Sequence, residues 1–168
     1  EQNIDNKIDF KSRVINFYKE NKIKIQIFLI AILISLISIA LLQAYNEKKN
    51  NQISEQFINA GILFTRDEKE KSKKIYEDIL KSNNRFYSTL ALNNIIEKNL
   101  EDNDDKILKY FDIIDKLQKN KEQKDLLKFK KALFLLKKLK TKEAKIILNE
   151  LIGSDSKIKN LAEDILAE

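Results

Sequence analysis

The longest apolar stretch of the chain runs from Ile27 to Leu42, with the sequence IFLIAILISLISIALL. No charged residue lies between Lys24 and Glu47. Eighteen helical residues from Ile25 measure roughly 27 Å, close to the hydrocarbon core of a bilayer at roughly 30 Å. The pattern therefore predicts a transmembrane helix over residues 25–45.

Two other interpretations of this stretch remain open. A buried helix of a water-soluble protein needs a polar face, and this stretch offers only Gln26, Ser35 and Ser38. A cleaved signal peptide has a short basic segment before its apolar core, whereas here a segment of mixed charge precedes it. Within the span, Ala31, Ser35 and Ser38 share one helix face, a pattern that lets a second membrane helix dock closely. Chance scatter is the alternative, because small residues are common in membrane helices.

The residues before the span predict a short amphipathic helix with basic flanks, because Phe10, Val14, Phe17 and Tyr18 recur at helical spacing. Six Lys or Arg lie in residues 5–24, but only Lys48 and Lys49 lie in residues 43–62. This bias places the N-terminus in the cytoplasm and the C-terminal part across the membrane. We therefore expect three parts: a cytoplasmic amphipathic segment (1–24), the transmembrane helix (25–45) and a domain on the opposite side of the membrane (46–168).

The C-terminal part alternates apolar stripes at helical spacing with short polar clusters, and it contains no Pro and only two Gly. Sheets need frequent turn residues, so this composition predicts an all-helical chain. The membrane helix continues through an apolar stripe up to Phe64, and further helices are expected at about 70–82, 86–99, 104–119, 123–139, 142–152 and 156–167. Candidate N-caps are Asp104, Thr141 and Ser154 or Asp155.

A pattern of apolar or small residues at i, i+4 and i+7 recurs along these helices, at offsets of 35 and 37 residues. The aligned sets are Ser72, Tyr76 and Ile79, then Ile107, Phe111 and Ile114, then Ala144, Leu148 and Leu151. The intervening helices align less regularly, through Ala60, Ala91, Ala132 and Ala162. Such a period is typical of helix-turn-helix repeats that stack into a curved array with a concave surface. An irregular helical bundle is the alternative.

The composition argues against catalysis and against bound metal. Cys and His are absent, which removes thiol nucleophiles, imidazole bases and the usual ligands of zinc and iron–sulfur clusters. The acidic pairs Asp104–Asp105 and Asp112–Asp115 lie in polar surroundings that suit a solvated helix face. We expect neither a cofactor nor an enzymatic activity. Because Met is also absent, we expect the N-terminus shown to be processed or cut from a longer chain.

A helical array tethered to a membrane suits the binding of another polypeptide. Its first helices carry five aromatic candidates for that surface: Phe64, Phe86, Tyr87, Phe129 and Phe134. Core packing is the competing role for each of them. A structural stalk is a second class of function, but the polar clusters between the helices interrupt the continuous heptads that a stalk would need.

A third class is electrostatic binding. Residues 119–145 hold eleven Lys and three carboxylates, in a chain of net charge +6. A solvated face or anionic lipid accounts for this stretch better than nucleic acid does.

The whole arrangement resembles a known family, the single-span, tetratricopeptide-like ancillary subunits of the SecYEG translocon. The resemblance rests on NFYKENK at residues 16–22, the span itself, FINAGILF at 57–64, and the segments RFYSTLALNNIIEKN and LLKFKKALFLLKKLK around Ala91 and Ala132. It implies a bacterial inner-membrane adaptor whose residues 46–168 form a degenerate tetratricopeptide-like domain in the periplasm. The implied partners are translocon subunits, periplasmic chaperones and emerging secreted chains. The fold of that family is shared with a periplasmic cell-division coordinator, so a structural scaffold or self-associating anchor is the alternative.

Overall fold

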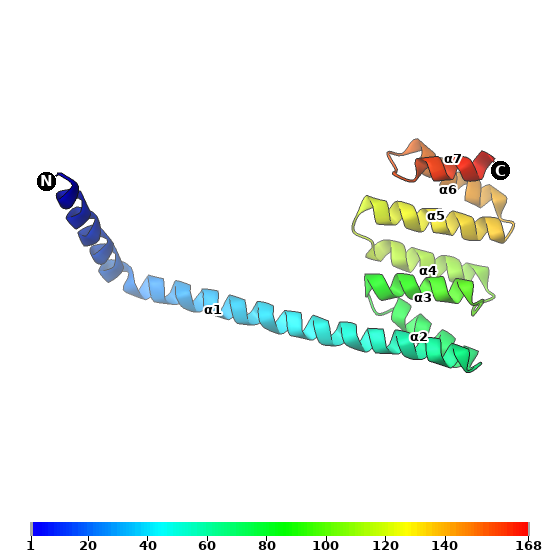
Figure 1. The fold of residues 1–168 in the computed structure, drawn as a ribbon, viewed down its shortest axis with the longest axis horizontal. Helices are drawn as coiled ribbons and strands as arrows, with labels where there is room; N and C mark the ends of the chain where they lie inside the picture. The colour runs from blue at the N-terminus through cyan, green and yellow to red at the C-terminus, as the bar shows by residue number, and fades with distance from the viewer. Residues whose placement is uncertain (1, 168) are drawn as a thin grey trace. The chain divides into compact units, whose positions relative to one another are not determined.

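The computed structural model describes the backbone of residues 2–167 and the side chains of residues 10–167. Over this range the chain is all-helical, with one long apolar helix near the N-terminus, as the sequence predicts (Figure 1). The helices are α1 (Gln2–Thr65), α2 (Lys69–Leu80), α3 (Arg85–Glu97), α4 (Asp104–Leu117), α5 (Lys121–Lys137), α6 (Thr141–Gly153) and α7 (Lys159–Ala167). The chain forms two compact units, residues 1–49 and 50–168.

The first unit is the N-terminal part of α1. Among the described residues, α1 is the one helix long and apolar enough to cross a membrane, and its most apolar stretch buries no side chain within the protein. Phe28, Ile34 and Leu41 are all more than half exposed. An apolar helix that finds no protein partner is stable where lipid replaces water around it. The Ser38 hydroxyl donates to the Ile34 carbonyl at 2.8 Å, so its hydrogen bond is made within the helix.

In the second unit, consecutive helices pack against each other as a stack of helical hairpins (Figure 1). The hydroxyl of Ser72 on α2 donates to the carbonyl of Ala60 on α1 at 2.8 Å, which fixes the first hairpin at close approach. Four turns contain one residue each in the left-handed region, namely Asp67, Asn83, Asn99 and Leu139. Asn and Asp tolerate this conformation well, so most of these turns are tight without glycine.

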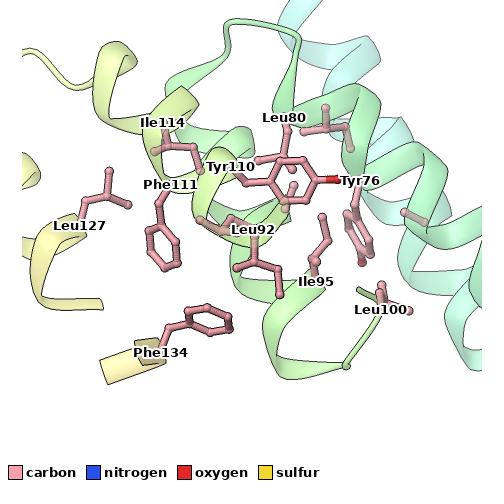
Figure 2. Packing of buried hydrophobic residues seen from close by; sticks show 14 of the residues in the cluster. Tyr76, Leu80, Leu92, Ile95, Leu100, Tyr110, Phe111, Ile114, Leu127 and Phe134 are labelled. Atoms are coloured by element: carbon pink, nitrogen blue, oxygen red, sulfur yellow. The ribbon is translucent and has the colours of Figure 1, made fainter. Parts of the chain in front are cut away.

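The core lies between the helices in two clusters. The larger cluster contains residues from all of the helices α1 to α5, and Tyr76, Leu92 and Ile114 are among its members (Figure 2). The smaller cluster joins α5, α6 and α7 around Ala132, Leu148 and Leu151. Every residue in the aligned sets at i, i+4 and i+7 is buried, and the four aligned alanines have no exposed surface. The sequence periodicity therefore identified the faces that pack.

The predicted N-caps are wrong. Asn103, not Asp104, caps α4, and its side chain accepts from the Lys106 amide at 3.1 Å. Thr141 is the first residue of α6, after Lys140. Ser154 ends α6, with its hydroxyl on the Leu151 carbonyl, and α7 begins only at Lys159, so neither Ser154 nor Asp155 caps it. In each case several polar residues adjoin the helix end, and the backbone geometry decides which of them caps it.

Candidate protein-binding groove

A groove runs between α3 and α5 and consists of two adjoining cavities of about 290 and 250 Å³. Asn93 on α3 and Lys130 on α5 line both cavities, so the two form one elongated depression. The Lys130 Nζ donates to the Asn93 Oδ1 at 3.3 Å and marks the boundary between them. We call this feature the α3–α5 groove.

The groove exposes large apolar side chains. Phe86, Leu126 and Leu133 line it and are 64%, 47% and 38% exposed. Phe86 lies on the face of α3 opposite the buried Ala91 and Leu92, because these positions are five and six residues away on a helix of 3.6 residues per turn. Apolar side chains lining a concavity are the usual basis for recognition of another polypeptide.

The charged groups of the groove are mostly cationic. Arg85, Lys130 and Lys137 line it, with Glu97 as the one carboxylate among its lining residues. Within the described part of the chain, none of these three cations forms an ion pair. The Gln123 Oε1 is also buried at the groove without a hydrogen-bond partner among the described residues. The groove thus offers positive charge and one free acceptor to whatever occupies it.

The two cavities have a spacing that matches a helix. On α3 the first cavity is lined by residues 85–93 and the second by residues 93–97, so the middles of the two lining segments lie about six to seven residues apart. Seven residues of α-helix rise about 10 Å. Side chains at positions i and i+7 of a docked helix are separated by the same distance, so one such pair can fill both cavities.

The structure does not bring the five aromatic candidates together on one surface. Phe86 is exposed in the groove, and Tyr87 packs beside it with ring centroids 5.1 Å apart. Phe134 lines the groove, but its side chain is only 5% exposed. Its ring centroid lies 6.0 Å from that of Phe111, so Phe134 packs in the core and offers little surface to a partner. Phe64 packs against the larger cluster beneath the Lys98 ammonium, and Phe129 packs against the smaller one.

Sequence reasoning missed Leu126, Leu133 and Gln123. Their position in the groove depends on α3 and α5 lining the same two cavities, which the periodicity of either helix alone does not indicate.

Part of the basic stretch 119–145 is neutralised within the fold. Lys128 pairs with Glu150 at 3.1 Å, Lys131 with Asp112 at 2.8 Å, and Lys138 with Asp104 at 2.9 Å. These pairs also place two of the acidic candidates, Asp104 and Asp112, opposite lysines. The stretch is therefore partly a set of links between α4, α5 and α6.

A buried polar network links the α3–α4 turn to α2 and α4, and nothing in the sequence pattern indicated it. The Glu101 carboxylate, 8% exposed, lies 3.1 Å from the Lys73 Nζ and 2.7 Å from the Lys106 Nζ. Burial raises the pKa of Glu101, but hydrogen bonds from Lys106, the Asn103 amide and Lys73 outweigh it and lower that pKa to about 2.

The same network continues to Glu77, which accepts from the Lys106 Nζ at 2.8 Å and from the Tyr110 hydroxyl at 2.9 Å. Burial and the neighbouring Glu77 raise the pKa of Tyr110 to about 12. Each carboxylate is held charged by fixed donors, so the network acts as a structural link between α2 and α4.

Comparisons with known proteins found no match: no family model, no curated protein and no solved structure is similar to this chain.

Proposed function

We propose that this chain is a membrane-anchored, non-catalytic adaptor that holds another polypeptide in the α3–α5 groove. The observation that carries the proposal is the groove itself: an apolar, cationic depression exposing Phe86, Leu126 and Leu133. The α1 helix, long and apolar enough to cross a membrane, supplies the anchor.

The occupant we propose is an amphipathic helix with two apolar side chains seven residues apart and an acidic residue between them. The two cavities accept the apolar pair. The acidic residue replaces Asn93 as the partner of Lys130, which lies between the cavities. Arg85 and Lys137 favour acidic residues at either end of the same segment.

The finer architecture and location are part of the proposal. A degenerate tetratricopeptide-like array is supported by the hairpin stacking and by the burial of all the aligned repeat positions. The excess of basic residues before the span supports a cytoplasmic N-terminus, with the helical array in the periplasm of a bacterial inner membrane. In that setting the partners are translocon subunits, periplasmic chaperones or emerging secreted chains, and Ala31, Ser35 and Ser38 form the face on which a membrane helix docks.

A peptide titration tests the groove. The full chain in detergent micelles is titrated with a fluorescent helical peptide that carries two leucines seven residues apart and a glutamate midway. Phe86→Ala and Leu126→Ala should each weaken binding by about tenfold, because each removes a large apolar contact. Lys130→Glu should weaken the binding of this glutamate peptide. The same variant should improve the binding of a second peptide that carries lysine midway in place of glutamate.

Ile146→Ala is the matched control, since Ile146 is 61% exposed on α6 and does not line the groove. Equal binding of the glutamate and lysine peptides, or equal affinities of the Phe86→Ala and Ile146→Ala variants, would show that the groove is not the binding site.

A further inference from the structure

The helical array of the second unit has two edges formed by its turns. One edge, here called the anchor edge, comprises residues 81–86, 118–124 and 153–159, and the other, the far edge, comprises residues 65–69, 98–105 and 137–143 (Figure 1). Contacts hold the turns of the anchor edge together: the Lys121 Nζ donates to the Asp155 carbonyl at 2.6 Å, and Lys157 pairs with Glu122 at 3.2 Å. Gln118 and Arg85 line the same cavity between α3 and α5.

The anchor edge lies where the chain enters the array. The Asn84 Nδ2, in the α2–α3 turn, donates to the Oδ1 of Asn50 at 2.9 Å, and Asn50 is the first residue of the second unit. Asn50 follows Tyr45, the last residue of the predicted span, by five positions. Five residues reach at most about 17 Å even when fully extended. The length of the chain therefore allows the Asn84 turn of this edge to lie close to any membrane that α1 crosses.

The two edges differ sharply in charge. The anchor edge holds seven Lys or Arg and two carboxylates, a net charge of +5 over its twenty residues. The far edge holds seven Lys or Arg and seven carboxylates over an equal number of residues, a net charge of zero. Overall composition cannot produce this difference, because both edges contain the same number of cations.

Several cations of the anchor edge have no internal partner. Lys81, Lys119 and Lys124 are exposed and, within the described part of the chain, form no ion pair. On the far edge Lys138 and Lys140 lie against Asp104, and Lys69 lies against Asp67. Its other cations, Arg66, Lys98, Lys137 and Lys142, form no ion pair among the described residues, but this edge holds as many carboxylates as cations. The positive charge of the anchor edge is thus available to a partner outside the protein.

We infer that the anchor edge rests on an anionic lipid surface, with its exposed lysines among the phospholipid headgroups. The inference depends on the membrane anchor of the proposed function, and the three unpaired lysines on which it rests, Lys81, Lys119 and Lys124, do not line the groove. Lipid attraction to lysine acts over about a Debye length, roughly 8 Å at physiological salt, which the short connection to Tyr45 allows. This contact fixes the orientation of the array relative to the bilayer.

A fluorophore on a single introduced cysteine tests the inference. The chain contains no cysteine of its own, so the label attaches only at the chosen position. The full chain carrying Asn83→Cys (anchor edge) or Asn99→Cys (far edge) is labelled with a fluorophore and reconstituted into vesicles that contain a headgroup quencher. The vesicles are phosphatidylcholine alone or phosphatidylcholine with phosphatidylglycerol. We expect strong quenching of the Asn83→Cys label only in the anionic vesicles, and weak quenching of the Asn99→Cys label in both.

Charge variants supply the control. Lys81→Gln with Lys119→Gln should lower the ratio of docked to free array by roughly 25-fold, at about fivefold for each lysine. Arg66→Gln with Lys142→Gln, which removes the same charge from exposed positions of the far edge, should leave the quenching unchanged. Raising the ionic strength from about 0.1 M to about 1 M should abolish docking, since the Debye length falls to about 3 Å.

Equal quenching of the Asn83→Cys label in the two kinds of vesicle would overturn the inference. A third label, at Ile34→Cys with a quencher on the acyl chains, separates this outcome from a failure of the anchor. If the Ile34→Cys label alone is quenched, the anchor is inserted and lipid contact by the anchor edge is rejected. If the Ile34→Cys label is not quenched, the membrane anchor is rejected, and both proposals fail with it.

Discussion

Glu101→Gln tests whether the buried polar network holds the α3–α4 turn in place. The substitution keeps the shape of the side chain and an oxygen that can accept from the Asn103 amide, but it removes the charge facing Lys73 and Lys106. The Glu101 pKa of about 2, against an ordinary value of 4.5, corresponds to about 3 kcal/mol of folding free energy. Because the Lys106 side chain is 41% exposed, we expect solvent to reduce this to about 2 kcal/mol.

The pH dependence of the loss identifies its cause. A carboxylate with a lowered pKa stabilises the fold fully above its unfolded pKa, near 4.5, and loses that contribution as the pH falls toward 2. The free energy of unfolding should therefore differ between wild type and variant by about 2 kcal/mol near pH 7, and this difference should shrink steadily below pH 4.5. Urea unfolding of the full chain in mild detergent, followed by circular dichroism, measures it.

Glu150→Gln is the control, because the Glu150 side chain is 56% exposed and its pair with Lys128 should contribute less than about 0.5 kcal/mol. The reasoning fails if Glu101→Gln costs no more than this control near pH 7. It also fails if the difference from wild type persists unchanged down to about pH 2.

Three further changes test the packing and the turns. Leu139→Asn should raise the free energy of unfolding by about 0.5–1 kcal/mol, because Leu139 has a φ of 59° and is 88% exposed, and an unchanged or lower urea midpoint would contradict this. Ile114→Ala, in the larger core cluster, should cost about 2–5 kcal/mol in the same assay, whereas Ile146→Ala should cost under about 0.5 kcal/mol. Asn84→Ala should lower the free energy of unfolding by about 1 kcal/mol, because it removes the side chain that caps the Tyr87 amide. Recovery of this free energy in Asn84→Ser but not in Asn84→Leu would identify capping as the cause.

The sequence predicted the helices and their buried faces because both follow from local spacing. Tyr76, Phe111 and Leu148 are each the middle member of a set of buried residues at i, i+4 and i+7, and an apolar stripe that wide has to pack against a neighbour. The same spacing could not identify caps, which depend on the backbone at one residue. Asp104 and Asn103 are adjacent polar residues, and only the geometry of the turn selects Asn103.

The groove and the polar network could not be predicted, because each joins residues far apart in the chain. Glu101 meets Lys73 only when the α3–α4 turn folds back beside α2. Phe86 was a candidate from its residue type, but Leu126 and Leu133 become groove residues only through the placement of α5 beside α3. Phe134 has the same residue type as Phe86, yet it faces the core because Phe111 lies opposite.

Site-specific photocrosslinking in intact membranes tests the central claim, that the α3–α5 groove of a membrane-anchored array holds another polypeptide. A photoreactive residue is placed at Phe86 or Leu133 in the groove, or at Ile146 outside it, and the crosslinked residues are identified by mass spectrometry. From both groove positions we predict capture of a partner segment that has two apolar residues seven positions apart and an acidic residue between them. This crosslink should be lost in the Lys130→Glu variant. It should not form from Ile146. Capture of a second copy alone, or the same products from Ile146 as from Phe86, would contradict the account and indicate a self-associating structural anchor.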